Sequence, residues 1–275
     1  MNPLEELERS IIKTYRREIW RNFAFAVGRY KLIQEGDRIA ACISGGKDSM
    51  LMAKCLQEMQ RHGPVGFWLE FLVMDPGYSK ENRSIIEKNA ERLGLPVHIA
   101  DSDIYEIVSK TEQSPCYLCA RMRRGCLYRH AEELGCNKIA LGHHFDDVVE
   151  TILLSMFFGG QVRTMMPKLH STNYPKMELI RPMYLIKEAD IIRWQKHNSL
   201  EFIKCACRFS EGEESSCSDK TGKRAQMKAL LTQLRQLDPK IEQNIFASVE
   251  NINLETIISY KKGNRCISFL DEYDL

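Results

Sequence analysis

The chain has 275 residues, of which 44% are hydrophobic and 28% charged, and its formal net charge is +2 at pH 7. These values are those of an ordinary globular protein with a core of one domain or slightly more. The longest strongly apolar run, residues 152–158, is far too short to span a bilayer. Glu5, Glu6 and Glu8 precede any apolar stretch, which is not typical of a secretory signal. We therefore expect a cytoplasmic enzyme without membrane contact.

Apolar positions at helical spacing predict a long basic amphipathic helix over residues 4–33. Strands and helices then alternate along the chain. We expect strands at 38–43, 65–74, 96–99, 138–141 and 179–182, and helices at 49–61, 80–93, 119–134, 146–158 and 187–198. This alternation favours right-handed βαβ units. The predicted fold is α/β: a doubly wound, mostly parallel sheet, a Rossmann variant, with helical N- and C-terminal extensions.

These elements divide the chain into an N-terminal helix (1–35), an α/β domain (36–207) and a C-terminal extension (208–275). Residues 208–223 are rich in Ser, Glu, Gly and Lys, a composition typical of a mobile loop. Helices are expected over 224–237 and, less regularly, over 241–260.

The segment Ser-Gly-Gly-Lys-Asp-Ser (44–49) connects the first predicted strand to a helix. Its glycines let backbone amides approach an anion, and the positive end of the following helix favours phosphate. Its hydroxyls and ammonium group add donors, and its carboxylate is a candidate Mg²⁺ ligand. The candidate nucleotide-binding residues are Ser44, Gly45, Gly46, Lys47, Asp48 and Ser49. The spacing is not that of the usual nucleotide P-loop, and taken alone the segment is also explained by a simple turn.

A second polar segment, Gly-His-His-Phe-Asp-Asp (142–147), follows the fourth predicted strand. Adjacent carboxylates repel each other unless a divalent cation lies between them and phosphate oxygens. We expect Asp147 to hold Mg²⁺ together with Asp48, and Gly142 and His143 to contact a nucleotide. The alternative is a helix cap formed by Asp146. Ligands of parallel sheets bind at the carboxyl ends of strands, where both segments fall.

Four of the ten cysteines form two close pairs, Cys116-x-x-Cys119 and Cys205-x-Cys207, beside polar or turn residues. Four thiolates suit tetrahedral zinc, whereas three thiolates with an open position suit a reactive iron–sulfur cluster. A metal-free dithiol or persulfide carrier is a third alternative. The spacing alone does not decide between them, and Cys217 has no assigned role.

Several separated motifs resemble those of the tRNA 2-thiocytidine synthetase family of PP-loop ATP pyrophosphatases. They lie, in order, at residues 36–39, 44–49, 116–125, 138–147, 167–169 and 180–182. The resemblance implies a tRNA sulfurtransferase that uses ATP and Mg²⁺ and carries a [4Fe–4S] cluster. Such an enzyme adenylates the C2 oxygen of an anticodon-loop pyrimidine, here cytidine 32, and replaces that oxygen by sulfur.

Carried over to this chain, the resemblance makes Cys116, Cys119 and Cys205 the cluster ligands. Cys207 is the alternative third ligand, because the family's proline is missing here and the second cysteine lies one residue closer. Met74 is expected to meet adenine through its backbone. The expected catalytic residues are Asp48, Arg123 and Asp147.

Basic residues cluster at residues 9–38, 121–129 and 220–228, which indicates a polyanionic partner. The resemblance makes this partner tRNA, with a cysteine desulfurase or free sulfide as sulfur donor and a homodimer as the assembly. Three other functions stay open: thiolation of a wobble uridine, an amidating or lysidine-type ligase with structural zinc, and a nucleic-acid-binding module or redox sensor with a vestigial nucleotide fold.

Overall fold

The structure is a computed structural model that describes residues 2–110, 115–203, 222–271 and 273, without the side chains of residues 115–117. The chain forms two compact units, residues 1–148 with 165–220, and residues 149–164 with 221–275. We call them unit 1 and unit 2 and describe each by itself. Helix α7 (Phe145–Gly159) contributes its first residues to unit 1 and the remainder to unit 2.

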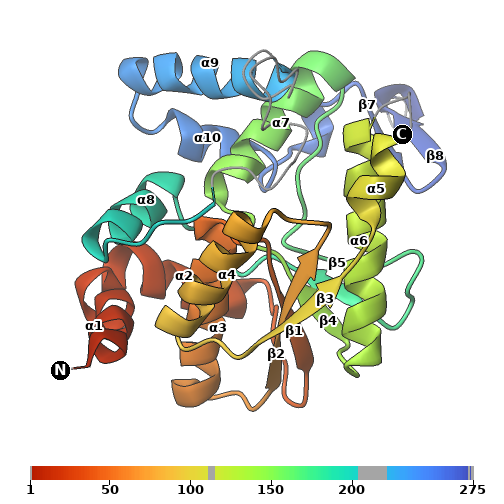
Figure 1. Ribbon diagram of the computed structural model, residues 1–275. Coiled ribbons are helices and arrows are strands. Elements are labelled where there is room, and N and C mark those ends of the chain that lie inside the picture. The colour runs from red at the N-terminus through yellow and green to blue at the C-terminus, as the bar shows by residue number, and fades with distance from the viewer. Residues whose placement is uncertain (1, 111–114, 204–221, 272, 274–275) are drawn as a thin grey trace. The chain divides into compact units, whose positions relative to one another are not determined.

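A six-stranded sheet forms the centre of unit 1, with the strand order β3-β2-β1-β4-β6-β5 (Figure 1). Its strands are β1 (Arg38–Ile43), β2 (Trp68–Asp75), β3 (Val97–Asp101), β4 (Lys138–Ala140), β5 (Lys168–His170) and β6 (Glu178–Ile180). All neighbouring pairs are parallel except β5 and β6. The prediction of a mostly parallel sheet is therefore confirmed, and β5 is an added edge strand that the sequence did not predict.

Helices cover both faces of this sheet, as the predicted doubly wound fold requires (Figure 1). They are α3 (Lys47–His62), α4 (Lys80–Arg92) and α8 (Glu188–His197) on one face, and α5 (Ile104–Ser109) and α6 (Pro115–Glu133) on the other. Alternate residues of β1 explain this division, because successive side chains of a strand point to opposite faces. Ile39 and Ala41 pack in the core with α3, α4 and α8, whereas Ala40 and Cys42 pack with Tyr128 of α6.

The N-terminal segment is helical from Pro3 to Arg29, somewhat shorter than the predicted 4–33. It consists of α1 (Pro3–Arg9), two π-helical segments (Ser10–Thr14 and Arg16–Trp20) and α2 (Arg21–Arg29). The amide of Tyr15 donates to the carbonyl of Ser10 at 2.8 Å, five residues back, so the helix is locally widened. The segment lays its apolar residues, among them Ile11, Ile19 and Phe23, into the core of unit 1.

Unit 2 contains the end of α7 and the C-terminal elements. These are α9 (Lys223–Leu237), α10 (Ile241–Ser248), β7 (Ser259–Lys262) and β8 (Arg265–Ser268). The predicted helix over 241–260 is wrong beyond residue 248. The Asn253 side chain accepts the amide of Glu255 and starts a short 3₁₀ turn, and Gly263, with φ of +60°, closes an antiparallel hairpin.

The predicted loop over 208–223 lies, apart from its last two residues, outside the described residues. In the parts of the chain that the structure describes, no helix is both long and apolar enough to cross a membrane.

A buried ion network joins the N-terminal helix to α3. The ammonium group of Lys54, which is fully buried, lies 2.6 Å from Glu8 Oε1 and 3.6 Å from Glu58 Oε1, and it donates to Gln57 at 2.7 Å. Arg61 adds contacts to both glutamates at 2.8 and 3.3 Å. The network satisfies the charges that the contact between α1 and α3 removes from water.

Replacing Lys54 by Met should lower the free energy of unfolding by roughly 3 kcal/mol, because the buried Glu58 carboxylate loses its closest buried cation. The double variant Lys54→Met/Glu58→Leu should recover much of this loss, since no unpaired charge is left. Urea unfolding of both variants measures the difference. A Lys54→Met variant as stable as the wild type would contradict a stabilising role for the network.

Candidate functional site

The loop between β1 and α3 turns at Gly45, which has a φ of +83°. A Cβ at this position would lie 2.6 Å from Ile86 Cγ1 and 2.7 Å from Ile203 Cδ1. Gly46, by contrast, is the N-cap of α3, has φ of −80°, and would bring a Cβ no closer than 3.7 Å to its nearest neighbour. The fold therefore requires glycine at 45, but it does not require glycine at 46.

The two serines of the loop hold it together. The hydroxyl oxygen of Ser49 accepts the amide of Ser44 at 3.1 Å, and its proton goes to the Gly46 carbonyl at 3.0 Å. The two hydroxyl oxygens lie 3.1 Å apart. In this arrangement Ser49 shapes the loop, and the amides of the first turn of α3, which have no intrahelical acceptor, form the anion-binding end.

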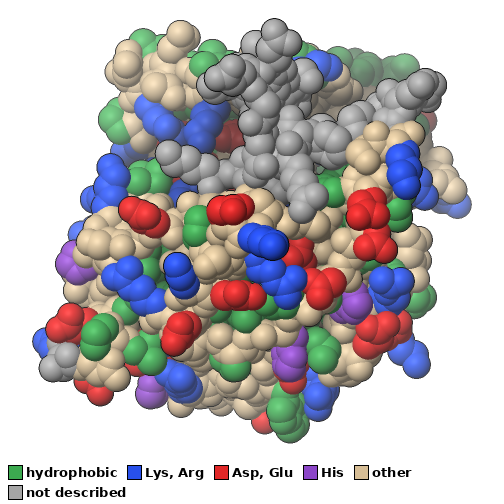
Figure 2. All heavy atoms as spheres, in the orientation of Figure 1, with side chains coloured by type: hydrophobic (Ala, Val, Ile, Leu, Met, Phe, Trp, Pro, Cys, Tyr) green, Lys and Arg blue, Asp and Glu red, His purple; other side chains and the backbone are tan. Residues whose placement is uncertain are grey.

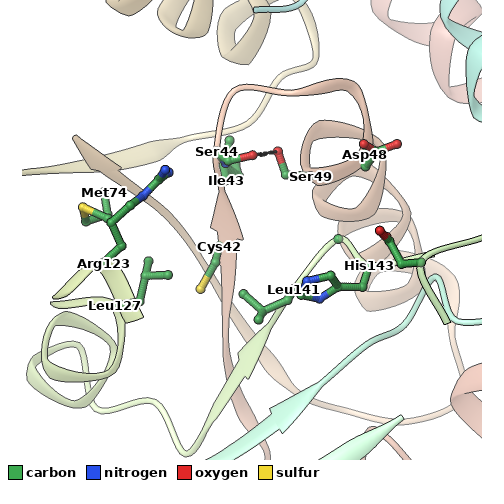
Figure 3. Close-up of a pocket in the computed structure, with 12 residues that line it drawn as sticks. Cys42, Ile43, Ser44, Asp48, Ser49, Met74, Arg123, Leu127, Leu141 and His143 are labelled. Carbon is green, nitrogen blue, oxygen red and sulfur yellow. Dashed lines mark hydrogen bonds between the residues drawn. The ribbon is translucent and has the colours of Figure 1, made fainter. Parts of the chain in front are cut away.

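A cavity of about 290 Å³ opens at the carboxyl ends of β1, β2 and β4. It is lined by Cys42, Ile43, Ser44, Asp48, Ser49, Met74, Arg123, Leu127, Leu141, Gly142, His143 and Asp147. In Figure 3, Met74 and Arg123 lie on one side of the end of β1, and Asp48 and His143 on the other. The structure thus brings together residues from both predicted polar segments, from β2 and from α6. Gly45 and Gly46 belong to the adjoining loop and Lys47 is the first residue of α3; none of the three is among the described residues that line the cavity.

The two polar segments touch directly. A Cβ on Gly142 would lie 2.9 Å from the amide nitrogen of Ser49 and 3.0 Å from the carbonyl carbon of Asp48. The backbone after β4 therefore packs against the first turn of α3, at a distance that excludes any side chain at position 142.

The carboxylates of Asp48 and Asp147 both lie near the same ring nitrogen of His144. His144 Nε2 is 3.9 Å from Asp48 Oδ1 and 3.6 Å from Asp147 Oδ2. Burial raises the pKa of Asp48 above its usual value, although Lys47 and His144 oppose this shift. The neighbouring Asp146 has a different role, because it accepts the amide of Glu188 at 2.7 Å.

This pair fits a magnesium ion shared with phosphate oxygens. Asp48 Oδ1 is buried and has no hydrogen-bond partner among the described residues, so it is an acceptor open to a donor or a cation. The described residues contain no group of three His, Cys, Asp or Glu side chains suited to hold a metal by themselves. Mg²⁺ commonly takes one or two protein carboxylates and completes its shell with phosphates and water.

His143 is oriented by Arg181, which follows β6. Arg181 donates from Nε to His143 Nδ1 at 3.3 Å and also binds the carbonyl of Met166. Burial lowers the pKa of Arg181 to about 10, so its guanidinium stays charged at neutral pH. With Nδ1 accepting, His143 carries its proton on Nε2. The sequence did not identify Arg181 as a site residue; the only signal was its place within the family-like motif at residues 180–182.

The predicted cluster ligands are placed only in part. Cys119 is buried in α6 and packs in one apolar cluster with Met74 and Tyr105. Cys116 lies three residues earlier in the same helix, at a neighbouring position of one helix face. Its side chain, together with Cys205, Cys207 and Cys217, lies outside the described residues. Arg123, one turn after Cys119, reaches the cavity, so α6 connects the cysteine pair to the site.

Comparison with known proteins identifies the class of this protein. Residues 13–207 match the model of the PP-loop domain, and the chain is a PP-loop protein. The tRNA-cytidine(32) 2-sulfurtransferase of Citrifermentans bemidjiense is 35% identical over 231 residues, 83% of this chain and 88% of that protein. The enzyme of the same name from Alcanivorax borkumensis is 37% identical over 252 residues, 89% and 84% of the two chains.

The chain therefore belongs to the family of tRNA-cytidine(32) 2-sulfurtransferases. The resemblance seen in the motifs, and with it the expectation of a sulfurtransferase enzyme, is confirmed. Among solved structures, the U34-tRNA thiolase NcsA from Methanococcus maripaludis, with its [4Fe–4S] cluster, has a similar fold. Its TM-score is 0.61 at 23% identity, over 93% of this chain and 82% of that one.

Alanine should destabilise the protein at Gly45 but leave its stability almost unchanged at Gly46. Gly45→Ala should lower the free energy of unfolding by at least about 1–2 kcal/mol, because its backbone is left-handed and its Cβ meets Ile86. Gly46→Ala should change it by less than about 0.5 kcal/mol. Thermal and urea unfolding check both values. Equal losses in the two variants would contradict the loop geometry.

Cys42 lines the cavity but should be chemically inert. Burial, with a smaller contribution from Cys136, raises the pKa of its thiol to about 12. Only the thiolate reacts, so alkylation by iodoacetamide at pH 8 should be about a thousandfold slower than for a free cysteine and should rise tenfold per pH unit. Mass spectrometry of each cysteine measures this rate, with the exposed Cys266 as reference. Rapid labelling of Cys42 in the folded protein would contradict the prediction.

Proposed function

We propose that this protein is an ATP-dependent tRNA sulfurtransferase that replaces the C2 oxygen of cytidine 32 by sulfur. The observation that carries the proposal is the single cavity around which the loop of residues 44–49, the segment of residues 142–147 and Arg123 of the cysteine-bearing helix α6 assemble. The family to which the chain belongs supports the choice of tRNA and of this position.

In this proposal the polyphosphate of ATP binds at the N-terminus of α3, where unpaired amides and the helix dipole favour anions. Lys47 adds a cation, and Asp48 and Asp147 would hold the Mg²⁺ that neutralises the departing pyrophosphate. His143 presents an Nε2 proton as a hydrogen-bond donor. Met74, whose side chain lines the cavity, is the proposed neighbour of adenine.

The base must leave its stack before its C2 oxygen can reach the cavity. That oxygen then attacks the α-phosphorus of ATP, the bond between the α- and β-phosphates breaks, and pyrophosphate leaves. The C2 oxygen is now part of an adenylate and departs as AMP when sulfur attacks C2. Arg123 is the cation placed to stabilise charge on the α-phosphate during both steps.

The sulfur chemistry belongs to a [4Fe–4S] cluster, which would be held by Cys116, Cys119 and Cys205, or by Cys207 in place of Cys205. When bound, such a cluster with one open iron position supplies activated sulfide. A cysteine desulfurase or free sulfide would renew it. Cys119 lies in one apolar cluster with Met74, which lines the cavity, and this placement supports an iron–sulfur cluster near the nucleotide.

The basic N-terminal segment is the proposed contact for the tRNA backbone. Lys13, Arg16, Arg17 and Arg21 are all exposed, whereas the apolar face of this segment is buried. On the face of unit 1 that Figure 2 shows, basic and acidic side chains are interspersed. Phosphate contacts of this kind weaken with rising salt concentration.

Protein purified without oxygen should form 2-thiocytidine at position 32 of tRNA when given ATP, Mg²⁺ and sulfide. The Cys116→Ala/Cys119→Ala variant should lose iron and lower the thiolation rate by at least about a hundredfold, while ATP-analogue binding persists. Nucleoside mass analysis, metal analysis and calorimetry measure the three effects.

The same assay separates the competing functions. Sulfur found in a wobble uridine would show that the enzyme modifies a different nucleotide by the same reaction. One tightly held zinc ion and no iron, with a tRNA-dependent consumption of ATP that the cysteine changes leave unaffected, would contradict the cluster mechanism. This result would favour a lysidine-type ligase.

A further inference from the structure

Glu188, the first residue of α8, contacts both halves of the site. Its backbone N–H donates to Asp146 Oδ2 at 2.7 Å, and its Oε1 lies 3.1 Å from the ammonium nitrogen of Lys47. Glu188 belongs neither to the segment of residues 44–49 nor to that of residues 142–147, and it lies far from both along the chain. Its side chain is only 18% exposed, so the ion pair is largely shielded from water.

The position of Glu188 does not depend on its carboxylate. The amide of Phe145 donates to the carbonyl of Ile186 at 2.9 Å, and Lys187 lies over the Phe145 ring. Together with the bond from the Glu188 amide to Asp146, these contacts fix residues 186–188 to the start of α7. A change of the Glu188 side chain that keeps its shape should therefore leave the backbone in place.

Lys47 lies between two carboxylates at nearly equal distances, 3.2 Å from Asp48 Oδ2 and 3.1 Å from Glu188 Oε1. Lys47 is therefore a cation that occupies one oxygen of Asp48, while the other oxygen, Oδ1, has no hydrogen-bond partner in the part of the chain that the structure describes.

A divalent cation on Asp48 would compete with Lys47, because both are positive and both use the same carboxylate. With Asp48 as its sole carboxylate, Lys47 would hold Asp48 and oppose the metal. With Glu188 at equal distance, Lys47 keeps a full ion pair after it leaves Asp48. The second carboxylate lowers the cost of that exchange.

We propose that Glu188 is a positioning residue that receives Lys47 when metal-bound nucleotide phosphate takes over Asp48. This inference rests on the proposed ATP and Mg²⁺ site and extends it to a residue outside both motifs. Glu188 does not touch the reacting atoms; it acts through Lys47.

The test measures binding without turnover. Calorimetry follows the binding of α,β-methylene-ATP to the full-length protein at increasing Mg²⁺ concentration, without tRNA. In Glu188→Gln the Mg²⁺ concentration for half-maximal binding should rise roughly tenfold, because Lys47 falls back onto Asp48. In a Lys47→Met background the same change should have no effect, since the competing cation is gone.

Asp190→Asn is the matched control. It removes the same charge from the first turn of the same helix, but Asp190 pairs with Arg193 instead of Lys47. Its Mg²⁺ dependence should equal that of the wild type. If Glu188→Gln lowers the melting temperature, Glu188→Asp, which keeps the charge but shortens its reach, should show an intermediate Mg²⁺ requirement.

An unchanged Mg²⁺ requirement in Glu188→Gln, or a change that persists without Lys47, overturns this inference and leaves the proposed function intact. A wild-type protein that binds no analogue at any Mg²⁺ concentration overturns the ATP site itself, and the inference with it.

Discussion

The geometry of the site depends on the absence of a side chain at position 142. Because Gly142 lies within contact distance of the Ser49 amide, the backbone after β4 packs directly on the first turn of α3. That contact brings Asp147 to the same histidine as Asp48, although the two residues lie in different motifs. A methyl group at this point would separate the carboxylates that the proposed metal must join.

The sequence was informative about the fold because its signals are local and repeated. Every strand predicted for the parallel sheet is present, since apolar runs bounded by helices admit few other arrangements. The π-helical widening around Tyr15 and the hairpin after residue 248 were missed, because each depends on hydrogen bonds that the apolar spacing does not indicate. The edge strand β5 was also missed: it has only three residues, and it joins the sheet by pairing with β6 alone.

The candidate site was predictable where residues of suitable chemistry directly follow a predicted strand. Glycine, lysine and carboxylate residues at the ends of strands pointed to one edge of the sheet, and the cavity lies there. Arg181 and Glu188 could not be found in this way, because each acts on a residue of another segment through a single contact. The difference between Gly45 and Gly46 also depends on tertiary packing against Ile86 and Ile203.

The buried pairing of Lys54 with Glu8 has a thermodynamic consequence. Helix α3 starts at the loop of residues 44–49, the proposed phosphate site, and is held to α1 further along by this ion network. A ligand whose binding to the N-terminal helix strengthens that contact also restricts α3. Linkage is reciprocal, so a nucleotide that orders the start of α3 must then favour the first ligand by the same free energy. Binding of a ligand to the N-terminal helix and binding of a nucleotide to the loop would in that case be thermodynamically coupled.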